Sequence, residues 1–153
     1  MKFGLYSSIA NPPRGEHLDR SIDEVIAEAQ LAETSGFDSC FFGEHHQDHD
    51  GFLPSPLIVA AAVAARTRRL RVGTSVILLP LHHPVHVAED AITLDLVSKG
   101  RVVLGVGIGY QPADFRAFPS RWRTALGASK RASRSCASAG LARRFPSVAS
   151  TTR

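Results

Sequence analysis

The sequence predicts an α/β fold built on a parallel sheet, and three observations support it. Four short apolar segments typical of buried strands lie at residues 2–9, 38–44, 70–79 and 101–106. Segments with helical spacing separate them, so strands and helices alternate along the chain. Polar or glycine-rich residues follow the second and fourth segments, where parallel folds place their sites. The pattern fits either part of a doubly wound sheet or half of an eight-stranded barrel.

The predicted helices have recognisable ends. The first is predicted to begin at Ser21, because Ser21 and Glu24 have the spacing of a capping box, and Gly36 is a suitable stop. Its apolar residues recur at helical spacing: Ile22, Val25, Ile26 and Ala29. Ser55-Pro56 resembles a cap followed by proline at the first helical position of an alanine-rich helix. A third helix is predicted from Pro84 to about Lys99.

Charge divides the chain into two parts. Residues 1–118 carry 10 basic and 14 acidic side chains, whereas residues 119–153 carry 8 basic and no acidic ones. The second part also contains seven each of Ser, Ala and Arg and few large apolar residues. We therefore expect a domain over 1–118 and a basic tail that is disordered, or the product of a frame-shifted translation. A disordered tail and a frame-shifted product are each favoured over a tail that binds nucleic acid.

The N-terminus and the two cysteines indicate a cytoplasmic location. No apolar run with a cleavage site follows Met1, and none approaches the length of a membrane span. Cys40 lies in a predicted buried strand and Cys136 in the tail, so no disulfide framework is expected. A membrane is accordingly not an expected partner.

The strongest site candidate follows the second strand. Its apolar run ends in Glu44-His45-His46, at the point where parallel barrels line their active sites. His45 is the candidate catalytic acid or base, because imidazole titrates near neutral pH. Six of the histidines form two clusters, but their spacing matches no zinc motif, so no metal site is predicted.

The fourth strand ends in the glycine-rich run 105–109. A nucleotide fingerprint would need a helix directly after these glycines, and none is evident. We interpret them as room for a ring or for backbone to approach, with Ile108 and Tyr110 at the same end.

An ordered set of motifs over residues 1 to about 118 resembles the bacterial luciferase-like flavin-dependent monooxygenase family. The motifs are Met1-Lys2-Phe3-Gly4, Gly36-Phe37-Asp38, Glu44-His45-His46, Leu70-Arg71-Val72-Gly73-Thr74, Leu79-Pro80, His83-Pro84, Glu89-Asp90, Leu94-Asp95, Ser98-Lys99-Gly100-Arg101 and Asp114-Phe115-Arg116. The resemblance implies an eight-stranded TIM-type barrel, of which this chain is the N-terminal half, with about four parallel strands and three helices. It also implies reduced FMN as cofactor, with a reduced deazaflavin as the alternative, and a small organic substrate oxidised with molecular oxygen. A flavin reductase partner and self-association are left open.

The resemblance assigns roles to individual residues. It places His45 near the reacting face of the flavin and Glu44 beside it. It places the backbone of Thr74-Ser75-Val76 beneath the flavin ring, sometimes through a cis bond, for which Ser75–Val76 is the candidate. From the sequence alone, a plain strand is preferred there. Ile108 and Tyr110 complete the expected cofactor contacts. Some members carry arginine where Ile108 stands, which argues against transferring the luciferase substrate.

The resemblance ends near Phe118, where Pro119 replaces a glycine usual in the family. In the family, later strands complete the barrel and supply the flavin phosphate site. We therefore expect this chain to be truncated and inactive. Two alternatives are retained, a deazaflavin-dependent oxidoreductase and a non-catalytic half-barrel whose tail binds polyanions.

Overall fold

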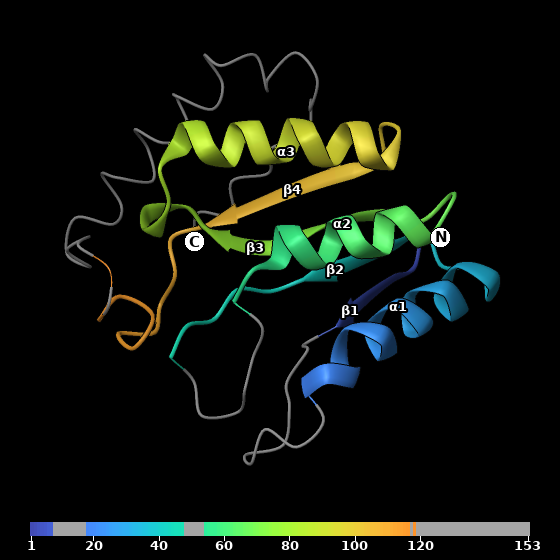
Figure 1. Cartoon of the computed structure of the whole chain (residues 1–153), viewed down its shortest axis with the longest axis horizontal. Coiled ribbons are helices and arrows are strands. Elements are labelled where there is room, and N and C mark those ends of the chain that lie inside the picture. The colour runs from blue at the N-terminus through green and yellow to red at the C-terminus, as the bar shows by residue number, and fades with distance from the viewer. Residues whose placement is uncertain (8–17, 48–53, 117, 119–153) are drawn as a thin grey trace.

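The computed structural model describes residues 1–7, 18–47, 54–116 and 118, and these form one parallel sheet with three helices (Figure 1). The strands are β1 (Gly4–Ser7), β2 (Ser39–Phe42), β3 (Arg71–Leu78) and β4 (Val102–Gly107), and the helices are α1 (Leu18–Thr34), α2 (Pro56–Arg66) and α3 (Pro84–Ser98), with a 3-10 turn η1 (Leu79–Leu81). The sheet order is β1-β2-β3-β4, and each neighbouring pair is parallel. The predicted α/β class and element order are thus confirmed. The tail at 119–153 lies outside the described residues, so its disorder and the domain boundary stay predictions.

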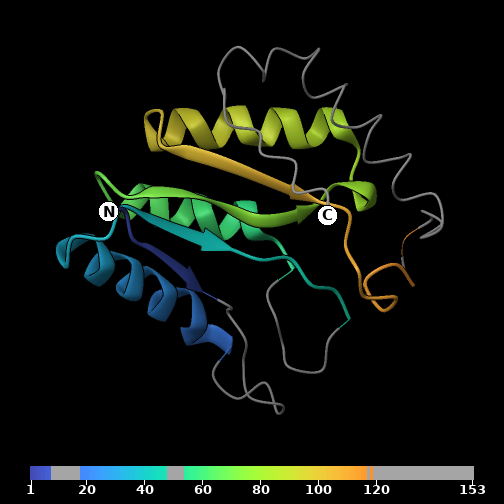
Figure 2. The ribbon, with the colours of Figure 1, turned by 180° about the vertical axis from the view of Figure 1, so that it is seen from behind.

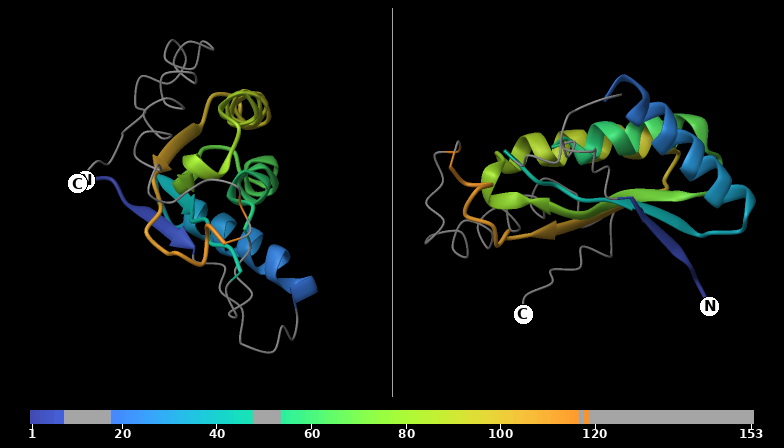
Figure 3. Two further views of the ribbon diagram at one scale, coloured as in Figure 1. Left: turned by 90° about the vertical axis from the view of Figure 1, so that its left-hand side faces the viewer. Right: turned by 90° about the horizontal axis from the view of Figure 1, so that it is seen from below.

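All three helices cover the same face of the sheet (Figures 2 and 3). Residues of β2 and β4 alternate between buried and half-buried, so one side of each strand packs into the core. The largest fully buried side chains of this core include Phe42, Leu70, Ile77, Leu79, Val63 and Val72. Within the described part of the chain, no helix is long and apolar enough to cross a membrane.

β3 and β4 approach each other closely because each strand carries a glycine that lies against backbone of the other strand. A Cβ on Gly73 would lie 1.7 Å from the Val103 carbonyl oxygen, and one on Gly105 would lie 2.2 Å from the Thr74 carbonyl oxygen. The Thr74 hydroxyl joins the strands by donating to the Gly105 carbonyl at 2.7 Å and accepting from the Gly105 N–H at 3.1 Å. The pairing register shifts between Thr74 and Ile77. These contacts hold the C-terminal parts of β3 and β4 side by side.

The start of α1 differs from the prediction. The helix begins at Leu18, so Ser21 lies inside it and the predicted capping box does not mark its first turn. Residues 18–20 have ordinary helix propensities, so nothing in them stops the helix from extending upstream of Ser21. The predicted stop at Gly36 is confirmed, because Gly36 has a φ of 87° and the Phe37 N–H donates to the Ala32 carbonyl.

The other helix ends follow the predicted proline positions, with one difference. Pro56 and Pro84 each lie in the first turn of their helices. Ser55 precedes α2, but its side chain makes no capping hydrogen bond; instead its carbonyl accepts the Ile58 and Val59 N–H groups. Serine thus marks the helix boundary without acting through its hydroxyl.

Candidate functional site

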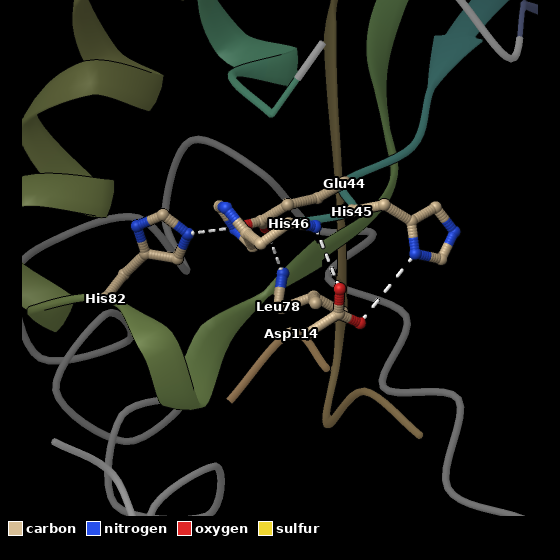
Figure 4. A network of polar contacts seen from close by, with 6 residues as sticks. All are labelled: Glu44, His45, His46, Leu78, His82 and Asp114. Carbon is tan, nitrogen blue, oxygen red and sulfur yellow. Dashed lines mark hydrogen bonds and ion pairs between the residues drawn. The ribbon is translucent and has the colours of Figure 1, made fainter. Parts of the chain in front are cut away.

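A buried carboxylate organises the loop that follows β2 (Figure 4). Glu44 is 2% exposed. Its Oε1 accepts hydrogen bonds from Nε2 of His46 at 2.6 Å and from Nε2 of His82 at 2.7 Å. Its Oε2 accepts the Leu78 N–H at 2.5 Å. Glu44 therefore ties the loop after β2 to the end of β3 and to the turn that follows it.

These contacts determine the charge state of Glu44. Burial raises the pKa of its carboxyl, but the hydrogen bond and charge of His82, the Leu78 N–H and the His46 hydrogen bond together outweigh burial and leave the pKa below its ordinary value. Glu44 is therefore an anion at neutral pH, held by donors on two separate segments.

A second buried carboxylate holds the same loop from the other side (Figure 4). Asp114 is 1% exposed and follows β4. Its Oδ1 accepts the His46 N–H at 2.8 Å, and its Oδ2 lies 3.7 Å from Nδ1 of His45. Two rings from the same segment contact the histidines: Tyr110 lies edge-on to His45 with centroids 6.4 Å apart, and Phe118 to His46 with centroids 4.7 Å apart.

A cavity of about 470 Å³ opens at the C-terminal ends of the strands. Its lining residues are Tyr6, Gly43, Glu44, His45, Ser75, Val76, Leu78, Gly107, Ile108, Gly109 and Tyr110. Six of the seven residues predicted from the sequence are therefore brought together: Glu44, His45, Ser75, Val76, Ile108 and Tyr110. They come from the segments that follow β2 and β4 and from the C-terminal half of β3, which the parallel topology places at the same edge of the sheet.

Thr74, the seventh predicted residue, does not line this cavity. It is buried, and its hydroxyl is occupied by the backbone of Gly105. The neighbouring Ser75–Val76 peptide bond is cis, so the preference for a plain strand at this point is wrong. The family resemblance places its candidate cis bond at this position.

Sequence reasoning missed two members of the network, His82 and Asp114. His82 belongs to the histidine cluster His82, His83 and His86, and Asp114 to the motif Asp114-Phe115-Arg116. Neither pattern predicts a contact with the loop after β2. Both reach the loop after β2 from distant segments, with 38 residues separating His82 from Glu44 and 68 separating Asp114 from His46. Among the described residues, no cluster of His, Cys, Asp or Glu is arranged to hold a metal ion.

The cavity fits one part of a flavin and lacks contacts for another. Val76, Ile108 and Tyr110 supply apolar and aromatic surface for a flat ring, while His45 and Glu44 supply polar groups at its edge. No lining residue in the described chain is a lysine or arginine that would pair with a phosphate. The ring of FMN thus has a matching surface here, and its phosphate does not.

The family model for luciferase-like monooxygenases matches residues 1–130. The alkanal monooxygenase alpha chain of a Kryptophanaron alfredi symbiont is 38% identical over 120 residues, which are 77% of this chain and 33% of that protein. The 4-hydroxyprotoasukamycin monooxygenase of Streptomyces nodosus subsp. asukaensis is 40% identical over 114 residues, 74% of this chain and 30% of that protein. The chain thus spans about a third of the length of the curated relatives it matches.

Solved structures agree with these sequence matches. A monooxygenase from Streptomyces bottropensis has a TM-score of 0.84 at 30% identity, over 89% of this chain and 42% of that one. The oxygenating constituent of 3,6-diketocamphane monooxygenase from Pseudomonas putida, solved with FMN, has a TM-score of 0.81 at 25% identity, over 89% of this chain and 38% of that one. The fold, the ordered motifs and these matches together show that the chain belongs to the luciferase-like monooxygenase family.

Proposed function

We propose that this chain provides half of a flavin-dependent monooxygenase site, in which the ring of reduced FMN occupies the cavity at the strand ends. The observation that carries the proposal is the convergence of His45, Glu44 and the apolar surface of Ile108 and Tyr110 on one cavity. The FMN in the Pseudomonas putida neighbour supports the choice of cofactor.

In this proposal the bound flavin supplies the activation of molecular oxygen that oxidises a small organic substrate. The chain's own residues bind the ring and move protons. Val76, Ile108 and Tyr110 bind the ring. His45 accepts or donates a proton at the edge of the cavity. Glu44 stays ionised and holds the loop that carries His45.

The substrate, the partners and the complete activity are part of the proposal, because the chain covers about a third of its relatives' length. We propose a small organic substrate, molecular oxygen, and a reductase that supplies the reduced flavin. A cytoplasmic location, where thiols stay reduced, is also proposed, and the free thiol of Cys40 is consistent with it.

Anaerobic calorimetric titration with reduced FMN tests the binding step. Ile108→Glu places a charge against the apolar ring surface, so we expect at least about a tenfold loss of affinity. Leu96→Glu is the matched control, since Leu96 is 63% exposed on α3 and away from the cavity. Equal affinity of the two variants, or no binding by the folded wild-type chain, would overturn the proposal. A stronger response to a reduced deazaflavin than to reduced FMN would favour the alternative cofactor.

Turnover is tested separately. Reduced FMN, oxygen and a panel of small aldehydes and ketones are supplied to the chain, and oxygenated products are sought by mass spectrometry. We expect no product from the truncated chain. If the wild-type chain does form product, His45→Gln should lower its formation by about 10²-fold, with a smaller effect on flavin affinity.

A further inference from the structure

One carboxylate after β4 contacts two consecutive residues of the loop after β2. Oδ1 of Asp114 accepts the backbone N–H of His46 at 2.8 Å. Its Oδ2 lies 3.7 Å from Nδ1 of His45, which is a charge contact and too long for a hydrogen bond. The first contact fixes the backbone beside His45. The second places negative charge next to one of the two ring nitrogens of His45.

Which ring nitrogen carries the proton in a neutral histidine is set by the group that the ring faces. A carboxylate only accepts hydrogen bonds, so it favours the proton on the nitrogen nearest to it. For His45 that nitrogen is Nδ1. The other nitrogen, Nε2, lies on the side of the ring away from Asp114 (Figure 4), and the side chain of His45 lines the cavity.

We propose that Asp114 is the positioning residue of His45: it anchors the loop through the His46 N–H and holds the His45 proton on Nδ1, so that Nε2 serves as the proton acceptor. The tautomer of His45 does not depend on the proposed function. Only the use of Nε2 as a proton acceptor during flavin chemistry rests on that function. When Nε2 takes up a proton, the carboxylate stabilises the imidazolium that results. Asp114 itself is buried and does not line the cavity.

The same network contains two internal controls. His46 and His82 both present Nε2 to Oε1 of Glu44, at 2.6 and 2.7 Å. Because the ionised carboxylate accepts only, both rings must carry their proton on Nε2. The structure therefore assigns His45 one tautomer and its two neighbours the opposite one.

The experiment is a long-range ¹⁵N–¹H correlation spectrum of the wild-type chain, with His45 assigned by its loss in His45→Asn. It is recorded at about pH 8, above the ordinary pKa of histidine. We expect Nδ1 of His45 at a protonated, pyrrole-type position and Nε2 at an unprotonated, pyridine-type position. His46 and His82 should show the reverse. A tautomer mixture at His45, or the proton on Nε2, would overturn the proposal.

Asp114→Asn supplies the decisive variant. Its amide oxygen can still accept the His46 N–H, while its NH₂ replaces Oδ2 opposite Nδ1. The His45 proton should therefore move to Nε2, and both ¹⁵N resonances should exchange their types, while His46 and His82 keep theirs. Asp23→Asn, an exposed site on α1, is the matched control and should change no tautomer. A purely structural role for Asp114 predicts unchanged tautomers at His45, or simultaneous changes at all three histidines.

The tautomers are measured without flavin, so the two proposals fail separately. Flavin binding with the wrong His45 tautomer overturns the role of Asp114 alone. The expected tautomers without flavin binding overturn the proposed function alone. If both hold, Asp114→Asn should lower turnover at least about tenfold, with a smaller effect on flavin affinity.

Discussion

At the scale of single residues, hydrogen bonds to the Glu44 carboxylate offset the cost of burying its charge. Its side chain is fully buried, and three donors from His46, His82 and Leu78 reach its two oxygens. Removing one partner from a buried, hydrogen-bonded charge costs more than the bond itself, because the remaining groups lose their partners. Glu44 should therefore matter to stability as well as to the site.

Glu44→Gln should lower the free energy of unfolding at pH 7 by roughly 2–4 kcal/mol. The folded-state pKa lies below the ordinary value of 4.5, so this stabilisation is present above that value and is lost as the pH falls through the folded pKa. Urea unfolding of both proteins from pH 7 down to pH 3 would test this, and the difference should shrink at the acid end. Glu89→Gln is the control, because its side chain is 68% exposed. A difference that does not depend on pH would contradict the assignment.

At the scale of elements, Arg101 joins the C-terminal ends of two helices to the sheet. Its guanidinium donates to the Ala64 carbonyl in the last turn of α2 and to the Thr67 carbonyl just after it. It also donates to the Ser98 carbonyl of α3 and to the Leu70 carbonyl before β3. A fifth bond goes to the Thr67 hydroxyl. A cation at helix C-termini also complements the helix dipoles. Only the planar fork of arginine reaches this set of acceptors at once.

Arg101→Lys should therefore destabilise the chain by about 2–3 kcal/mol, because an ammonium cannot replace all five bonds. Arg71→Lys serves as the comparison, since Arg71 is exposed and should change stability by no more than about 0.5 kcal/mol. Chemical denaturation of the two variants gives the result. Equal stabilities would show that the Arg101 bonds are replaced by water at little cost.

At the scale of the whole molecule, the helices cover one side of the sheet, and the hydrophobic core lies between them. Cys40 belongs to this core, so its reactivity measures how often the core opens. Cys40 is fully buried, and burial together with the charge of Glu28 raises its pKa to about 12. Because the thiolate is the reactive form, Cys40 should react only when the core opens.

Cys40 should be labelled at least about a thousandfold more slowly in the native chain than in urea. Cys136→Ser provides the background, which leaves Cys40 as the single cysteine. Mass spectrometry after timed alkylation measures the rate. Labelling as fast as in urea would show that the sheet and helices do not form a stable core.

The choice between riboflavin and FMN also depends on the whole molecule, because no lysine or arginine of the described residues lines the cavity to bind the FMN phosphate. Riboflavin and FMN in their reduced forms should bind within about threefold of each other, since only the ring finds matching surface. Calorimetry with both ligands tests this. FMN binding more than about tenfold tighter would place a phosphate-binding cation outside the described residues.

Sequence patterns alone predict the order of strands and helices, the parallel class, and the positions of Glu44 and His45 just past a strand. These follow from apolar periodicity, proline, and glycine at Gly36, which act within a few neighbouring residues. Tertiary structure decided the rest. The partners of Glu44 and His45 come from His82 and Asp114 on distant segments, and only the register of β2, β3 and β4 brings them together. The start of α1 differed because local propensity allowed the helix to extend beyond its apparent cap.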